Sequence, residues 1–173
     1  GVWPCLKRIA TAPHPTQPLN KIVGGINLDG GRPHSHARDM VLIGNGASEL
    51  EDILGGILKT QDRVISPDPQ PENGSFYRSD HISLSRVGVP MLDPSGASDM
   101  IVGGTAEGER IREDYRKNHY HQPSDEFDPK WDITGVIDDL DALITFGDTL
   151  ANSDRWPNWY KDNEFRAIRD KSM

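Results

Sequence analysis

A carboxylate and an imidazole that lie far apart along the chain are the first candidates for chemistry. Asp29 follows an apolar run at residues 21–28 and precedes Gly30 and Gly31, which let the chain turn. Such a run is typical of a strand buried on both faces, and open α/β sheets bind ligands beyond the carboxyl ends of these strands. Asp29 is therefore a candidate metal ligand; the alternative is that it only caps the turn. The apolar residues of the run are Ile22, Val23, Ile26 and Leu28.

The second candidate is His121, in a polar segment at residues 120–126 that contains Pro123. This segment follows one helical pattern and precedes a longer one, and loops held by a rigid scaffold often carry ligand-binding residues. Neutral imidazole and carboxylate together form a ligand set that suits zinc. His34 and His36 also have a spacing that suggests metal binding, but a solvated loop is the favoured interpretation for them.

Hydrophobic periodicity predicts the elements that must bring such residues together. In addition to residues 21–28, strands are expected at residues 39–45, 63–65 and 89–92. Helices are expected from residue 48 onward and at residues 79–87, 106–117 and 132–151. The alternation predicts an α/β fold with a mixed, largely parallel sheet and helices on both faces.

Two of these helices carry more specific expectations. Ser48 and Glu51 have the spacing of a capping box, in which each side chain accepts a hydrogen bond from a free backbone N–H. In the helix at 132–151, one apolar stripe is expected to face the sheet while the aspartates face solvent. The stripe consists of Ile133, Val136, Ile137, Leu140, Leu143, Ile144, Gly147 and Leu150, and the aspartates are Asp138, Asp139, Asp141 and Asp148.

Composition limits the classes of partner and the compartment. The 173 residues suffice for one domain with a real core, and a net charge of −8 argues against binding to a nucleic-acid backbone. No apolar run approaches the roughly 20 residues of a membrane span. The single cysteine, Cys5, excludes an intrachain disulfide, and the N-terminal residues do not resemble a secretory signal.

Three regions are expected along the chain. Residues 1–20 are rich in proline and read as an irregular arm, because proline blocks regular hydrogen bonding. Residues 21–151 carry the predicted strands and helices. Residues 152–173 form an aromatic and basic tail that is expected to pack on the domain.

Three segments occur in one order along the chain, namely INLDG, ENGSFYRSDHISLSRVGVPML and YHQPSDEFDPKWD. In combination they resemble the C-terminal half of the M28 family of zinc-dependent metallopeptidases, the aminopeptidase type, from about His14 to the C-terminus. The resemblance implies a three-layer zinc-aminopeptidase-like fold that is incomplete here on its N-terminal side. It also implies a peptide substrate, two zinc ions that activate a water for peptide-bond hydrolysis, and export to the periplasm or the extracellular space.

The resemblance also implies roles for individual residues. Asp29 matches the terminal carboxylate ligand of one zinc ion, and His121 matches the terminal imidazole ligand of the other. Ser79 and Asp80 match a supporting segment, in which Asp80 either orients neighbouring groups or stabilises a helix N-terminus. Three further residues either contact the substrate or the developing oxyanion or have structural roles, and these are Tyr77, Arg78 and Tyr120.

The chain departs from the family at the other ligands. The family uses two His, two Asp and one Glu to hold its metals and a further Glu as general base. Its His-x-Asp segment and its Glu-Glu pair have no counterpart here, so only Asp29 and His121 are retained. The chain alone is therefore expected to be an inactive fragment of such an enzyme.

Other interpretations remain open. The chain could be a non-catalytic module that binds peptides or a protein partner. It could also be a relative of the single-zinc, glutaminyl-cyclase-like transferases, which resemble M28 peptidases and retain a ligand equivalent to His121. In each case, absent N-terminal strands would expose part of the sheet, through which the chain would associate.

Overall fold

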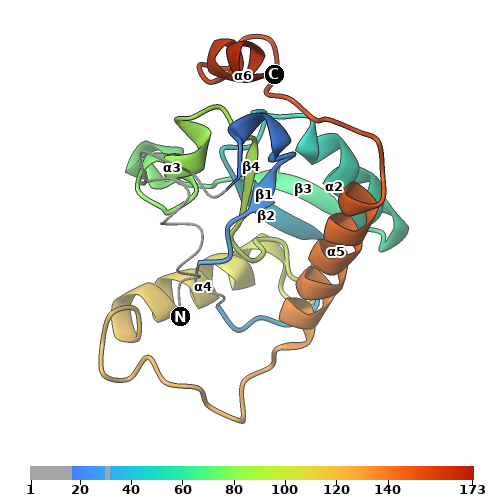
Figure 1. The fold of residues 1–173 in the computed structure, drawn as a ribbon. Coiled ribbons are helices and arrows are strands. Elements are labelled where there is room, and N and C mark those ends of the chain that lie inside the picture. The colour runs from blue at the N-terminus through green and yellow to red at the C-terminus, as the bar shows by residue number, and fades with distance from the viewer. Residues whose placement is uncertain (1–16, 30–31) are drawn as a thin grey trace.

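A four-stranded sheet organises the computed structural model, which describes residues 17–29 and 32–173 (Figure 1). The strands are β1 (Gly25–Ile26), β2 (Asp39–Ile43), β3 (Val64–Pro67) and β4 (Met91–Pro94), in the order β1-β4-β2-β3. The β1–β4 and β2–β3 pairs are parallel, and the β2–β4 pair is antiparallel. The sheet is therefore mixed and mostly parallel. Most of the predicted N-terminal arm, residues 1–16, lies outside the described residues.

Helices connect the strands and pack against them. The α-helices are α2 (Leu50–Thr60), α3 (Ile82–Ser85), α4 (Gly104–Asn118), α5 (Thr134–Ala151) and α6 (Arg166–Ser172). Three short 3₁₀ helices are η1 (Leu19–Lys21), η2 (Pro71–Asn73) and η3 (Ser75–Tyr77). Figure 1 shows α2 and α5 side by side next to the sheet, and α4 below it. Within residues 17–29 and 32–173, no helix is long and apolar enough to cross a membrane.

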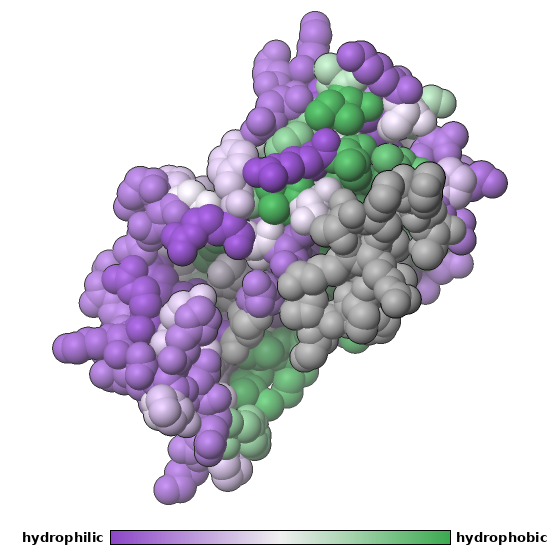
Figure 2. Space-filling model, turned by 60° about the vertical axis from the view of Figure 1, so that its left-hand side comes forward, coloured by the Kyte–Doolittle hydropathy of each residue, from purple (hydrophilic) through white to green (hydrophobic). Residues whose placement is uncertain are grey.

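Strand β4 supports apolar packing on both of its faces, because neighbouring residues of a strand point in opposite directions. Leu92 packs with side chains of α2 and α5, whereas Met91 packs with Leu84 of α3. The larger cluster joins Leu92 to Met40, Leu42, Leu50, Ile53, Leu54, Leu58, Ala142, Leu143, Phe146 and Leu150. In Figure 2, hydrophilic residues dominate the left and outer parts of the face, and hydrophobic residues gather towards its middle.

The first strand is shorter than the apolar run predicted. Only Gly25–Ile26 pair with β4, and β1 is an edge strand among the described residues. Leu28 lies beyond the last pairing and is 63% exposed. The expectation of a long strand buried on both faces is therefore wrong. Apolar composition alone does not determine how many residues find a pairing partner.

Helix α5 buries only part of the predicted stripe, in which Leu143 and Leu150 are 6% and 7% exposed. Ile137, Leu140 and Ile144 are 55%, 45% and 71% exposed, although all three were expected to face the sheet. A Cβ added at Gly135 would lie 2.1 Å from the carbonyl oxygen of Ser35, so this glycine lets the helix approach the loop before β2. The residues that α5 buries are Gly135, Asp139, Ala142, Leu143, Phe146 and Leu150.

A buried charged cluster fixes this orientation of α5. Asp139, which was expected to face solvent, is buried and accepts a hydrogen bond from the guanidinium of Arg63. His34 is also buried, and its Nε2 lies 3.2 Å from the second carboxylate oxygen of Asp139. The expectation of a solvated loop is therefore wrong for His34, whereas His36 is exposed on the surface. Burial lowers the pKa of His34, but the hydrogen bonds to Asp139 and to the carbonyl oxygen of Ser35, together with the charge of Asp139, outweigh burial and raise the pKa above its ordinary value.

The N-terminus of α2 forms only half of the predicted capping box. The carboxylate of Glu51 accepts hydrogen bonds from the backbone N–H groups of Gly46, Ala47 and Ser48 at 2.7, 2.7 and 3.0 Å. The hydroxyl of Ser48 is buried and has no hydrogen-bond partner within the described residues. Glu51 therefore satisfies the Ser48 amide as the box predicts, whereas the backbone N–H of Glu51 donates to the carbonyl oxygen of Ser48 at 3.1 Å instead of to its hydroxyl.

The aromatic tail lies against the rest of the structure. Trp159 is fully buried, and its indole N–H donates to the carbonyl oxygen of Gly88 at 2.9 Å. Arg169 of α6 is also fully buried and donates to the carbonyl oxygens of Leu19 and Ile22 at 3.2 and 2.9 Å. The segment after α5 therefore reaches back to the residues that lead into β1.

Candidate functional site

Polar side chains meet where β1 and β4 end, because the two strands are parallel. The backbone N–H of Asn27 donates to the carbonyl oxygen of Leu92 at 2.8 Å and continues the ladder beyond β1. The side-chain amide of Asn27 donates to Ser79 Oγ at 2.8 Å and to Asp93 Oδ1 at 2.9 Å. Ser79 Oγ in turn donates to Asp29 Oδ2 at 3.3 Å.

His81 lies at the other end of this arrangement. Its Nδ1 is 3.3 Å from Asp93 Oδ2, and its ring packs edge-on against Phe76 with 4.6 Å between ring centroids. Neither ring nitrogen makes a hydrogen bond within the described part of the chain. We call the five residues Asn27, Asp29, Ser79, His81 and Asp93 the strand-end network.

Burial disfavours the charged forms of both His81 and Asp93. Burial, together with repulsion from Asp29 and Asp68, outweighs the hydrogen bond from Asn27 and raises the pKa of Asp93 to about 6. Burial lowers the pKa of His81 to about 4, against the opposing charge of Asp80. Near neutral pH the network therefore contains a neutral imidazole, that of His81, beside an ionised carboxylate, that of Asp93, whose pKa lies only about one unit below the pH.

The structure places the two predicted zinc ligands in different surroundings. Asp29 is exposed, and Ser79 orients its carboxylate. His121 is exposed in the loop after α4, has a left-handed backbone with φ of 59°, and stacks on Tyr120 at 3.9 Å between ring centroids. Among residues 17–29 and 32–173, no hydrogen bond or ion pair joins Asp29 to His121.

The described residues do not form a zinc site by themselves. Zinc takes four ligands in structural sites, and at least three of them come from the protein in catalytic sites. The described part of the chain contains no group of three or more His, Cys, Asp or Glu side chains that could hold a metal ion. One carboxylate and one separate imidazole do not fit the ion, so no chemical step at zinc follows from these residues.

The other predicted residues surround the strand-end network or lie apart from it. Tyr77 is 55% exposed, and its hydroxyl donates to Glu164 Oε1 at 2.6 Å. Arg78 is exposed, and its backbone N–H donates to the carbonyl oxygen of Ser75 at the end of η3. Asp80 is half-buried next to His81, and Tyr120 is half-exposed beside His121.

Sequence patterns missed Asn27 and Asp93. Asp93 lies in β4 and directly follows the predicted strand at residues 89–92, just as Asp29 follows the apolar run at residues 21–28. Applying the same rule to both strands would have identified it, since parallel strands end at the same edge of a sheet. The role of Asn27 depends on partners in two distant segments, namely Ser79 and the adjacent residues Leu92 and Asp93, and no local pattern predicts them.

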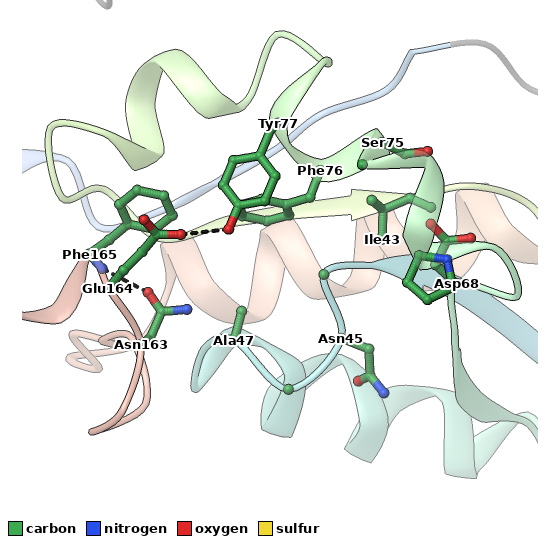
Figure 3. Close-up of a pocket in the computed structure, with 14 residues that line it drawn as sticks. Ile43, Asn45, Ala47, Asp68, Ser75, Phe76, Tyr77, Asn163, Glu164 and Phe165 are labelled. Carbon is green, nitrogen blue, oxygen red and sulfur yellow. Dashed lines mark hydrogen bonds between the residues drawn. The ribbon is translucent and has the colours of Figure 1, made fainter.

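A cavity of about 320 Å³ opens beside the network, at the end of β2 (Figure 3). Phe76 connects the two features, because its ring contacts His81 and also lies 6.2 Å from the ring of Phe165. Hydrogen bonding to Glu164 raises the pKa of the Tyr77 hydroxyl. The lining residues are Ile43, Gly44, Asn45, Gly46, Ala47, Asp68, Pro71, Gly74, Ser75, Phe76, Tyr77, Asn163, Glu164 and Phe165.

Comparison with known proteins gives one match. A model described as Peptidase family M28 matches residues 7–144. The match begins before the expected start at His14 and ends within α5, whereas the motifs suggested that it would reach the C-terminus. It contains the whole strand-end network but not residues 163–165 of the cavity. No curated protein and no solved structure matches the chain. With 138 of its 173 residues inside the match, the chain belongs to peptidase family M28.

Proposed function

We propose that this chain contributes to a zinc-dependent aminopeptidase-type peptidase, which removes N-terminal residues from peptides. The observation that carries the proposal is the setting of Asp29 at the end of β1. Asn27 donates to Ser79, and Ser79 donates to Asp29, so the carboxylate is held by a chain of two hydrogen bonds. Metal-binding carboxylates are commonly oriented by neighbours of this kind.

In this proposal, Asp29 and His121 each serve a different zinc ion. The bound metals would supply an activated water and polarise the peptide carbonyl. The described residues provide only these two of the five ligands that the family resemblance implies. Hydrolysis therefore requires the other three ligands and a general base from polypeptide outside the described residues.

The decisive test uses the longest natural polypeptide that contains this sequence. The DNA upstream is first read in all frames for His-x-Asp and Glu-Glu codons. Zinc content is then measured by mass spectrometry, and hydrolysis is followed with an aminoacyl 4-nitroanilide. We expect Asp29→Ala and His121→Ala each to lower zinc content and to reduce turnover by about 100-fold or more, since loss of even a supporting neighbour commonly costs 10–100-fold.

Asp162→Asn provides a matched control, because Asp162 is exposed on the tail and has the same charge as Asp29. Unchanged zinc content and turnover in Asp29→Ala would contradict the assignment of Asp29. Absence of the upstream codons would contradict hydrolysis by this gene product.

A non-catalytic binding module is the second candidate. The observation that favours it is a formed cavity in a structure whose described residues contain no metal-binding group. Calorimetric titration of the 173-residue chain with zinc tests this candidate, because tight stoichiometric binding would contradict a purely non-catalytic role.

A further inference from the structure

We propose that the cavity beside Tyr77 binds a primary alkylammonium group, such as the side chain of lysine. Its volume of about 320 Å³ is at the lower end of the range for small-molecule sites, which suits one side chain or one small amine. None of its lining residues belongs to the strand-end network, and the inference requires no zinc. It therefore goes beyond the proposed peptidase function.

The charge of the lining favours a cation. Asp68 and Glu164 line the cavity, and among residues 17–29 and 32–173 no Lys, Arg or His side chain lines it. Figure 3 shows the two carboxylates on opposite sides, with Phe76 between them. The hydroxyl of Tyr77 donates a hydrogen bond to Oε1 of Glu164, but a carboxylate can accept about four hydrogen bonds in all. An ammonium group that enters the cavity would therefore find further acceptor positions on either carboxylate.

The remaining lining favours an organic cation over a metal ion. Phe76 and Phe165 stack with 25° between their planes, and Ile43 and Ala47 add aliphatic surface. An alkyl stem would pack on this apolar surface, and an ammonium group within about 6 Å of a ring centroid would gain a cation–π interaction. Metal ions such as Ca²⁺ instead require about six to eight oxygen ligands, which this apolar lining does not supply.

Backbone geometry holds the cavity open. Gly44 has φ of +74°, and a Cβ at this position would lie 2.3 Å from the ring of Phe76. Gly74 also has a left-handed backbone, with φ of +64°, where the chain enters η3. Since these turns fix the backbone that lines the cavity before any ligand binds, binding loses little conformational entropy of the protein.

The test is an NMR titration of the ¹⁵N-labelled 173-residue chain in EDTA. The probes are n-butylammonium, a capped lysine (Nα-acetyl-lysine N-methylamide) and their neutral counterparts, n-pentanol and capped norleucine. We expect saturable shifts of the amides of Gly44, Gly46 and Gly74. The ammonium probes should bind at least about threefold more tightly than the neutral probes, as expected for a partly exposed charge pair.

Isosteric variants identify the groups responsible. Glu164→Gln keeps an acceptor for Tyr77 and removes one charge, and Asp68→Asn keeps an acceptor for the backbone N–H of Gln70. Each should weaken ammonium binding by about threefold or more without lowering the melting temperature. Glu72→Gln removes the same charge from an exposed residue outside the lining and should leave binding unchanged.

Each outcome bears on the proposal. Saturation by capped lysine supports a peptide side chain as the ligand, and saturation by butylammonium alone supports a small free amine. The proposal is overturned by absence of saturable shifts, by equal binding of the neutral probes, or by equal weakening in Glu72→Gln. Because EDTA removes zinc, none of these results depends on the peptidase assignment.

Discussion

At the scale of single residues, the buried contact between His81 and Asp93 is the most informative feature. Burial raises the pKa of Asp93 from 3.8 to about 6 and lowers the pKa of His81 from 6.5 to about 4. Asp93 therefore contributes stability below about pH 4 that is lost as the pH rises towards 6. His81 acts in the opposite sense, because the unfolded chain takes up its proton first and stability is lost as the pH falls from 6.5 to about 4.

The first prediction separates these two opposing effects. At one pKa unit per 1.36 kcal/mol, each effect reaches on the order of 3 kcal/mol, so in the wild type they largely cancel between about pH 4 and 6. Asp93→Asn should leave the His81 effect, so that the free energy of unfolding falls as the pH is lowered through this range. His81→Gln should leave the Asp93 effect, so that the free energy of unfolding rises as the pH is lowered through the same range.

Urea denaturation at several pH values between about 4 and 7 measures both slopes. Asp162→Asn, on the exposed surface, should retain the pH dependence of the wild type. Slopes of the same sign in Asp93→Asn and His81→Gln would show that the two groups do not titrate as their burial implies.

Sequence reasoning located some of these residues and could not locate others. The rule that an acidic residue just after an apolar run marks the end of a strand correctly predicted that Asp29 follows a strand. Asp93 fits the same rule. The burial of His34 was not predictable, because it depends on Asp139, which is 105 residues away. Whether Asp29 and His121 share a metal site stays a prediction.

At the scale of elements, α5 shows where periodicity becomes ambiguous. Strand β2 and helices α2, α4 and α5 lie close to their predicted ranges, because local patterns and caps determine where such elements occur. Periodicity does not determine which face of α5 is buried. Apolar residues surround most of α5, so more than one stripe fits the helical repeat, and the contacts of Gly135 and Asp139 select among them.

The second prediction tests the observed face of α5. Leu143→Ala should lower the free energy of unfolding by about 2–5 kcal/mol, because Leu143 is 6% exposed and belongs to the main apolar cluster. Ile144→Ala should change it by less than about 0.5 kcal/mol, because Ile144 is 71% exposed. Urea denaturation of both variants provides the measurement, and the reverse ranking would mean that α5 does not bury the face that contains Leu143.

At the scale of the whole molecule, the segment after α5 is part of the folded structure although it lies beyond the family match. Trp159 packs with Phe165 of the same segment and with Ile82 and Ala47, which come from two other parts of the chain. Family motifs end before this segment and could not indicate that it contributes to a core. Association through an exposed part of the sheet also depends on long-range structure and stays a prediction.

The third prediction compares two tryptophans of the same segment. Trp159→Ala should destabilise the chain by about 3–5 kcal/mol, because it removes a fully buried ring and leaves the carbonyl oxygen of Gly88 without its donor. Trp156→Ala should cost less than about 1.5 kcal/mol, because Trp156 is 45% exposed and contacts Arg169 chiefly through a cation–π interaction. Thermal unfolding measures both, and equal losses would indicate that the tail packs differently.

The contact of Arg169 with Leu19 has a consequence for biosynthesis, since the two residues are 150 positions apart. At about 5–20 residues per second, the ribosome needs roughly 8–30 s to add the intervening residues. During that interval the carbonyl groups of Leu19 and Ile22 lack the Arg169 donor, so the nascent polypeptide cannot yet form this long-range contact. The contact between α6 and the residues that lead into β1 can therefore form only after residue 169 has been synthesised.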